Sequence, residues 1–158
     1  MKTNIATTKE QSARLLQCGV PAESADMSYQ FIDECVNNTD KPICSTPKEQ
    51  FNTLIGYGFG ENRIHITPAF SLSALLGLLP KEIKVDESPY DEVQKYALLI
   101  YPFMDGWQVD YQYCEDDECH CLKCVYGIDP IEACVKAIEW LTANGYKLNG
   151  IEKGGGEQ

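Results

Sequence analysis

The sequence has no long hydrophobic run and no apolar segment near its start. Its longest apolar stretches, residues 72–79 and 97–104, are shorter than the roughly 20 residues that a transmembrane helix needs. The opening stretch, MKTNIATTKEQ, is polar and lacks the apolar centre of a secretory signal. These absences predict a cytoplasmic protein that makes no membrane contact.

Basic residues are also scarce. Lys and Arg number 13 against 24 Asp and Glu, which gives a formal net charge of −11. The excess is greatest in residues 81–125, where eleven acids face four lysines for a net charge of −7. Such a surface repels a phosphate backbone, so we expect no direct binding to nucleic acid. The charge first favours solubility, and second a basic protein partner, including one that normally binds DNA.

Recognisable catalytic motifs are missing as well. The two histidines, His65 and His120, lie in no H-E-x-x-H pattern, and no G-x-S-x-G surrounds the serines of residues 71–73. The run at residues 56–60 reads G-x-G-x-G, with Glu61 where the dinucleotide fingerprint needs its third glycine. This run predicts a glycine-rich turn. We therefore predict that the protein is not an enzyme.

The composition is that of a globular protein, with 44% hydrophobic and 23% charged residues. The pattern predicts a single α+β domain over residues 1–153 and a flexible glycine-rich tail at residues 154–158. Its first half predicts a helix at 8–18, a strand near 29–32, a strand or helical turn at 51–55, a strand at 63–67 and a helix at 71–79. Capping boxes formed by Thr7 with Glu10 or by Thr8 with Gln11 would start the first helix.

The second half predicts an antiparallel meander over about residues 95–126, with helices packed on one face. A strand at 96–101 is apolar on both faces, as expected of a central strand. An Asp-Gly turn leads to an alternating strand at 107–113, and a third strand follows at 122–126. The alternating strand has one solvent-facing side: Gln108, Asp110 and Gln112.

The last predicted element is an amphipathic helix that begins at Asp129-Pro130 and ends at Asn144-Gly145. Apolar residues recur on it at helical spacing, and they form one stripe: Ile131, Cys134, Val135, Ile138 and Leu141.

Several stretches give the chain a resemblance to a family of uncharacterised small proteins from gut bacteria and their bacteriophages. The most specific is Ser71-Leu72-Ser73-Ala74-Leu75-Leu76, preceded by Pro68-Ala69-Phe70. The others are Met1-Lys2-Thr3-Asn4-Ile5 with Glu10-Gln11-Ser12, Ala25-Asp26-Met27, Gly106-Trp107, and residues 133–141. The resemblance implies a phage or mobile-element setting, and it implies no activity and no metal.

The densest chemistry lies in five metal-capable side chains: Cys114, Cys119, His120, Cys121 and Cys124. Thiolate and imidazole are zinc ligands, so the cluster could hold zinc or another soft metal. Apart from this possibility, we expect no cofactor. A strand beginning at Cys119 would turn Cys119 and Cys121 to one side and Cys124 to the other, whereas a turn would let the thiolates converge. A disulfide from Cys114 to Cys121 or Cys124 is the alternative. A reducing cytoplasm disfavours it, so we expect free thiols.

Together these features predict a non-enzymatic, cytoplasmic protein-interaction domain that acts on an unidentified protein partner. Two alternatives stay open. One is a metal-binding or redox-sensing domain that uses residues 114–124, and the other is an acidic inhibitor of a DNA-binding partner. The sequence does not indicate the oligomeric state.

Overall fold

The computed structural model describes residues 4–86 and 93–151. The fold is α+β, as predicted, with helices and two antiparallel sheets. The chain divides into two compact units, Met1–Leu76 and Gly77–Gln158. The expectation of one domain over residues 1–153 stays a prediction, and the proposed tail at 154–158 lies outside the described residues. In the part of the chain that is described, no helix is long and apolar enough to cross a membrane.

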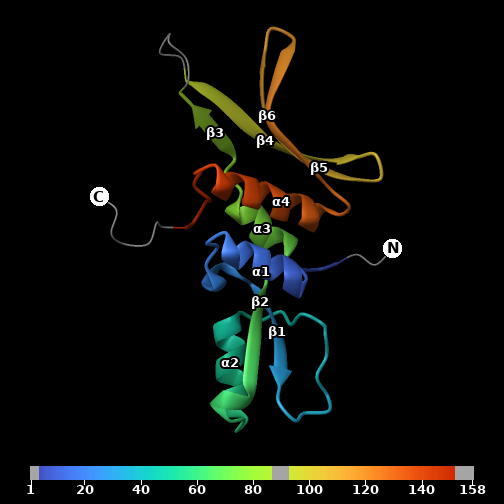
Figure 1. The fold of residues 1–158 in the computed structure, drawn as a ribbon, viewed down its shortest axis with the longest axis vertical. Coiled ribbons are helices and arrows are strands. Elements are labelled where there is room, and N and C mark those ends of the chain that lie inside the picture. Colours follow the sequence, from blue (N-terminus) through green and yellow to red (C-terminus); the bar gives the residue numbers. More distant parts are fainter. Residues whose placement is uncertain (1–3, 87–92, 152–158) are drawn as a thin grey trace, which may run out of the picture. The chain divides into compact units, whose positions relative to one another are not determined.

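The first unit is built on a two-stranded antiparallel sheet, β1 with β2, against which helix α2 packs (Figure 1). The predicted capping box of Thr8 and Gln11 starts helix α1. The elements are α1 (Lys9–Gln17), a 3-10 turn η1 (Ala22–Ser24), β1 (Met27–Ile32), α2 (Pro47–Gly56), a 3-10 turn η2 (Glu61–Arg63) and β2 (Ile64–Ala69). The predicted helix at 8–18 and the strands near 29–32 and 63–67 are confirmed.

Helix α2 settles the alternative left open for residues 51–55 in favour of a helix, and the helix is longer than expected. Thr46 accepts a hydrogen bond from the Glu49 backbone, the Glu49 side chain accepts one from the Thr46 backbone, and Pro47 occupies the first turn. This capping box is visible in the sequence as Thr-Pro-Lys-Glu. Gly58, in the turn that follows, has a φ of 94°, which explains the glycine at that position.

The predicted helix at 71–79 is α3 (Leu72–Leu78), and the boundary between the two units falls within it. The Ser71 hydroxyl accepts a hydrogen bond of 3.1 Å from the Ala74 backbone, so Ser71 starts the helix as predicted. Leu72, Leu75, Leu76 and Leu79 recur at helical spacing and predict one buried stripe. That prediction is partly wrong, because Leu76 is 40% exposed and Leu78 is buried instead. Leu75 and Leu79 are both 0% exposed, as the spacing predicts, although the helix itself ends at Leu78.

The second unit contains a four-stranded antiparallel sheet with the order β3-β4-β5-β6. Its elements are β3 (Glu82–Val85), β4 (Gln94–Phe103), β5 (Gly106–Glu115), β6 (Glu118–Gly127) and α4 (Pro130–Ala143). The strands β4, β5 and β6 are the predicted meander. The β4–β5 loop is Met104–Asp105, with Met104 at a φ of 55°, so Gly106 already belongs to β5.

Helix α4 contacts β5 and β6 and buries its predicted stripe completely (Figure 1). Val109 and Tyr111 of β5 are 1% exposed on the face toward this helix. Burial raises the pKa of the Cys134 thiol to about 12, with a smaller contribution from Asp129. Burial, and secondarily the Cys134 thiol, also raises the pKa of Tyr111. The Tyr111 hydroxyl donates a hydrogen bond of 2.8 Å to the Pro80 carbonyl.

The opposite face of the sheet corrects two predictions. Strand β4 is central but is not covered on both faces, because Leu99 is 42% exposed. A central position satisfies the strand's backbone hydrogen bonds, and it does not by itself supply a layer over each face. The second correction concerns Asp110, which was predicted to face solvent and is 0% exposed.

Candidate functional site

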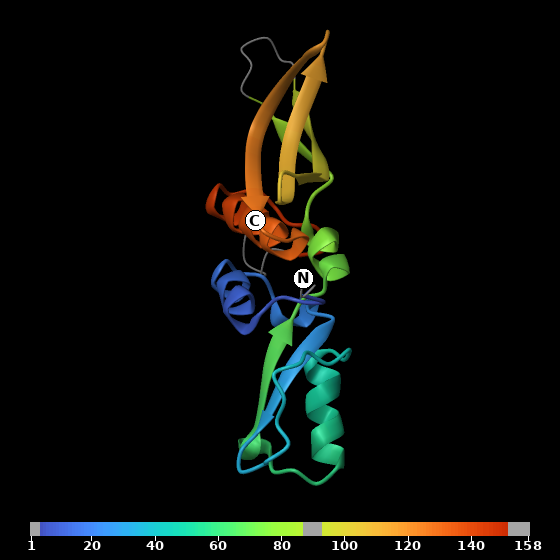
Figure 2. The same ribbon diagram turned by 90° about the vertical axis from the view of Figure 1, so that its right-hand side faces the viewer.

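The hairpin formed by β5 and β6 carries all five residues of the predicted cysteine cluster. Its strands are joined by two residues, Asp116 and Asp117, whose φ angles of 50° and 66° lie in the left-handed region. Aspartate tolerates this region better than most residues. The predicted acidic loop is therefore a tight turn, and the third strand begins at Glu118 instead of residue 122. Figure 2 shows the hairpin with its turn at the end away from α4.

A β-bulge decides which way the cysteines face. Tyr111 pairs with Lys123 and Gln112 pairs with Cys121, so Leu122 is an extra residue in β6. Residues paired across two strands share a face of the sheet. Cys124 therefore shares a face with its partner Asp110, and Cys121 shares that same face with Gln112. The prediction that a strand would turn Cys124 away from Cys121 is wrong, because it assumed unbroken alternation.

The remaining two cysteines lie farther along the same face. Cys119 pairs directly with Cys114, which follows Gln112 by two residues. All four cysteines of the hairpin thus share one face. His120 pairs with Tyr113 on the other face, where the two rings stack with centroids 6.4 Å apart. The structure accordingly brings together four of the five predicted site residues and leaves His120 out.

The four sulfur atoms form two disulfide pairs in the structure. Cys114 is bonded to Cys119, with their Cα atoms 4.1 Å apart. Cys121 is bonded to Cys124, with a Cα separation of 6.7 Å. The pairing of Cys114 with Cys121 or Cys124, considered from the sequence, is not the one observed, because the tight turn places Cys119 directly opposite Cys114. Whether the thiols are free in the cell stays a prediction.

Asp110 is the residue of this face that sequence reasoning did not select. It is fully buried, and one of its carboxylate oxygens lies within 4.8 Å of the sulfur atoms of Cys121 and Cys124. Both cysteines are exposed. These three side chains could hold a metal ion, since each offers one ligand atom. The sequence does carry a signal for this residue. Asp110 is an acidic residue in the middle of a predicted strand, with Gln108 two residues before it and Gln112 two residues after it.

Hydrogen-bond donors surround the Asp110 carboxylate. The Tyr101 hydroxyl donates to it from β4. The Gln108 amide donates at 2.8 Å to one oxygen and at 3.1 Å to the other, and the Gln112 amide donates at 2.8 Å. The bond to Asp110 is the main reason why the pKa of Tyr101 is raised. These donors hold the carboxylate in one orientation next to the sulfur atoms.

The four cysteines outside the hairpin are free thiols, unlike the four hairpin cysteines. Cys134 is buried and its raised pKa keeps it protonated, so it is an inert core residue. Cys44 is exposed, and Cys18 and Cys35 are partly buried. The structure describes no disulfide for any of these four in residues 4–86 and 93–151. The hairpin is therefore where paired cysteine chemistry is concentrated.

The second histidine, His65, lies on β2 and is exposed. Its Nε2 atom is 3.0 Å from a carboxylate oxygen of Asp33, and both side chains are about half exposed. The Arg63 guanidinium donates at 2.7 Å to the Asp33 carbonyl. The His65–Asp33 pair links β2 to the residue that follows β1, and it is a solvent-exposed contact.

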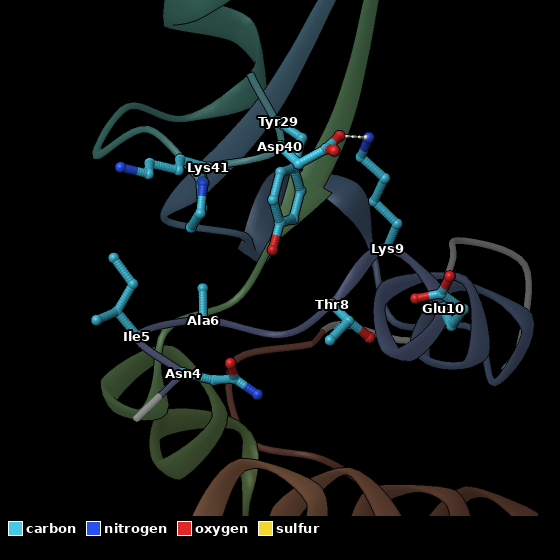
Figure 3. Close-up of a pocket in the computed structure, with 10 residues that line it drawn as sticks. Asn4, Ile5, Ala6, Thr8, Lys9, Glu10, Tyr29, Asp40 and Lys41 are labelled. Atoms are coloured by element: carbon cyan, nitrogen blue, oxygen red, sulfur yellow. Dashed lines mark hydrogen bonds and ion pairs between the residues drawn. The ribbon is translucent and has the colours of Figure 1, made fainter. Parts of the chain in front are cut away.

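A surface groove lies in the first unit, beside the start of α1 and the Tyr29 ring (Figure 3). Lys9 spans it, with its ammonium 3.2 Å from an Asp40 oxygen and 5.6 Å from the centre of the Tyr29 ring. Its described lining residues include no cysteine and no histidine. Two lysines line it, Lys9 and Lys41, and Lys9 already has a carboxylate partner. The groove therefore offers less varied chemistry than the hairpin.

Comparison of the chain with family models, with curated proteins and with solved structures finds no match. The function therefore has to be argued from the hairpin itself.

Proposed function

We propose that the protein is a non-enzymatic, redox-responsive interaction module, in which the Cys121–Cys124 pair cycles between dithiol and disulfide. The observation that carries the proposal is the bulge at Leu122, which places two exposed cysteines on one face within bonding distance. Without the bulge, strand alternation would separate them. The sequence left redox sensing open as an alternative, and this geometry now favours it over the acidic-inhibitor alternative.

The chemistry needs only an oxidant that carries a disulfide, such as oxidised glutathione. The thiolate of one cysteine attacks the small disulfide, releasing one glutathione thiol and leaving a mixed disulfide. The second cysteine then displaces the other glutathione. Two cysteine protons and two electrons are transferred in total, one S–S bond forms in the protein and one breaks in the oxidant. Both cysteines are exposed, so the small molecule can reach them.

The same face also supports the predicted interaction role. Leu99 and Phe103 of β4 and Tyr126 of β6 are between 40% and 43% exposed. Leu99 pairs with Asp110 and Tyr126 pairs with Gln108, so both lie on the cysteine face. A partner protein bound there would contact apolar side chains next to the cysteine pair. The oxidation state of the Cys121–Cys124 pair would then directly change the surface that the partner contacts.

Thiol trapping across a glutathione series tests the proposal. The protein is equilibrated at stepped ratios of reduced to oxidised glutathione, alkylated, and mapped by mass spectrometry. We expect Cys121 and Cys124 to lose alkylation together, in a single two-electron step. Exposed Cys44 is the control, since it has no described disulfide partner and should form only a mixed disulfide with glutathione.

Two variants sharpen the test. In Cys121→Ser, Cys124 should behave like Cys44 and trap glutathione as a stable mixed disulfide. In Cys114→Ser, the Cys121–Cys124 step should persist unchanged. The proposal fails if Cys121 and Cys124 stay fully alkylated at every ratio, or if they pair with Cys114 and Cys119 instead of with each other.

A further inference from the structure

We infer that the reduced hairpin is a binding site for a thiophilic divalent cation such as zinc, with Asp110, Cys121 and Cys124 as its ligands. The inference rests on the proposed function in one respect, because the two cysteines must be able to exist as a dithiol. It changes the ligand set expected from the sequence. Asp110 enters the set, and His120 leaves it because it lies on the other face of the hairpin. Cys114 and Cys119 also leave it, because they pair with each other nearer the turn.

The first support is the spacing of the three side chains. Their ligand atoms all lie within 4.8 Å of one another. Around a tetrahedral zinc ion with Zn–S bonds of about 2.3 Å, neighbouring ligand atoms are roughly 3.5–3.8 Å apart. Once the S–S bond is reduced, rotation of the two cysteine side chains supplies the small adjustment that remains. No movement of the strands is required.

The second support is the burial of Asp110 itself. Its side chain is fully buried, and among residues 4–86 and 93–151 no lysine or arginine forms an ion pair with it. A buried carboxylate without a cation is costly unless other groups compensate for its charge. A divalent ion bound to Asp110, Cys121 and Cys124 would offset two of the three negative charges that the carboxylate and the two thiolates carry.

The third support is the set of donors around Asp110. Tyr101, Gln108 and Gln112 all donate hydrogen bonds to its carboxylate. Metal-binding carboxylates are commonly held by such outer contacts, which fix the ligand before the ion arrives. The three donors come from two strands, so the site is preformed by the sheet. Two thiolates with one carboxylate favour zinc over magnesium or calcium, which prefer all-oxygen sites.

Three protein ligands leave one position of a tetrahedron for water or an external group. Oxidation would remove two of the three ligands at once, because both sulfur atoms would enter a disulfide. The site is therefore expected to bind the ion only in the reduced state and to release it on oxidation.

Zinc binding by the reduced chain of 158 residues tests the inference. The protein is reduced with a phosphine, freed of metal with a chelator and titrated with zinc in competition with a chromophoric chelator. We expect one zinc per chain for the wild type and a loss of at least about tenfold in affinity for Asp110→Asn. Cys121→Ser and Cys124→Ser should lose binding, whereas Cys44→Ser and His120→Ala should keep it. Circular dichroism of each variant shows whether it is folded.

Cobalt substitution identifies the ligands independently. Cobalt bound to the wild type should show sulfur-to-metal charge-transfer absorption of two thiolates, and Cys121→Ser should reduce it to that of one. Absence of zinc binding by the folded, reduced wild type would overturn the inference, as would equal affinity in the folded Asp110→Asn variant. Glutathione trapping in the absence of metal reports on the redox proposal separately, since the pair can cycle whether or not zinc binds.

Discussion

Asp110 and Cys124 face each other across β5 and β6, and the first is fully buried while the second is exposed. The side chain of Asp110 is covered from the sides by Tyr101, Gln108 and Gln112, which donate hydrogen bonds to it. An exposed sulfur atom is thereby placed next to a carboxylate that is fixed by hydrogen bonds. This combination distinguishes the hairpin from the chain's other cysteines.

Ile138→Ala should destabilise the second unit by about 2–4 kcal/mol, because Ile138 is 0% exposed and its loss leaves a cavity under the sheet. Lys136→Ala is the matched control on the same helix. Lys136 is exposed and donates one hydrogen bond of 2.9 Å to the Tyr126 carbonyl, so its loss should cost under about 0.5 kcal/mol. Urea denaturation of the two variants measures the difference. Equal midpoints would mean that α4 presents another face to the core.

Gly127→Ala should cost about 1–3 kcal/mol through overpacking. A Cβ atom at Gly127 would lie 2.8 Å from the Ala133 Cα atom, and its nearest neighbours are backbone atoms of α4 that have no freedom to rotate away. Gly77→Ala is the control within α3, since nothing lies within 4 Å of its added Cβ atom and alanine favours a helix. Thermal melting should therefore move in opposite directions for the two variants. A neutral Gly127→Ala would contradict the close approach of β6 to α4.

Much of the fold could be predicted because its signals are local. The helix after Asp129 follows from the helical spacing of its apolar residues, and the meander follows from the Asp-Gly turn and the alternation of apolar and polar residues along residues 107–113. The burial of Asp110 could not be predicted, because it depends on glutamines and a tyrosine that surround it only once the strands pair. The common face of Cys121 and Cys124 depends on one extra residue, Leu122, and nothing in the sequence marks that residue as a bulge. Helix α2, by contrast, had a usable signal in Thr46 and Glu49.

Alkaline pH should destabilise the protein through Cys134. Its pKa is raised from 9.0 to about 12 in the folded state, so the folded chain keeps a proton that the unfolded chain releases. The resulting stabilisation is fully present below pH 9 and is lost as the pH rises from 9 toward 12. For this one group the slope reaches about 1.4 kcal/mol per pH unit. Urea denaturation at stepped alkaline pH should give a shallower slope for Cys134→Ala than for the wild type. Identical slopes would contradict a protonated, buried thiol.

The protein should not bind duplex DNA at physiological salt. Phosphate contacts need Lys or Arg, and residues 81–125 carry a net charge of −7. A gel-shift titration into the micromolar range measures this, with a basic DNA-binding protein as the positive control. A shifted band that weakens with added salt would show that basic residues outside this segment form a phosphate-binding surface.

The reduced, metal-free chain should remain folded, because the hairpin cysteines lie outside the core. The fully buried residues of the second unit include Val109, Tyr111, Ile138 and Leu141, and none of the four hairpin cysteines is among them. A structural zinc site behaves differently, since its binding free energy is folding free energy and a chelator unfolds the domain. We therefore expect the reduced protein to keep its near-ultraviolet circular dichroism in a strong chelator and to melt cooperatively. A variant with Ser at 114, 119, 121 and 124 should do the same. Collapse of the spectrum in the chelator would make the metal part of the fold, whereas retention of the spectrum followed by a rise in melting temperature on adding zinc would fit a preformed site at Asp110, Cys121 and Cys124.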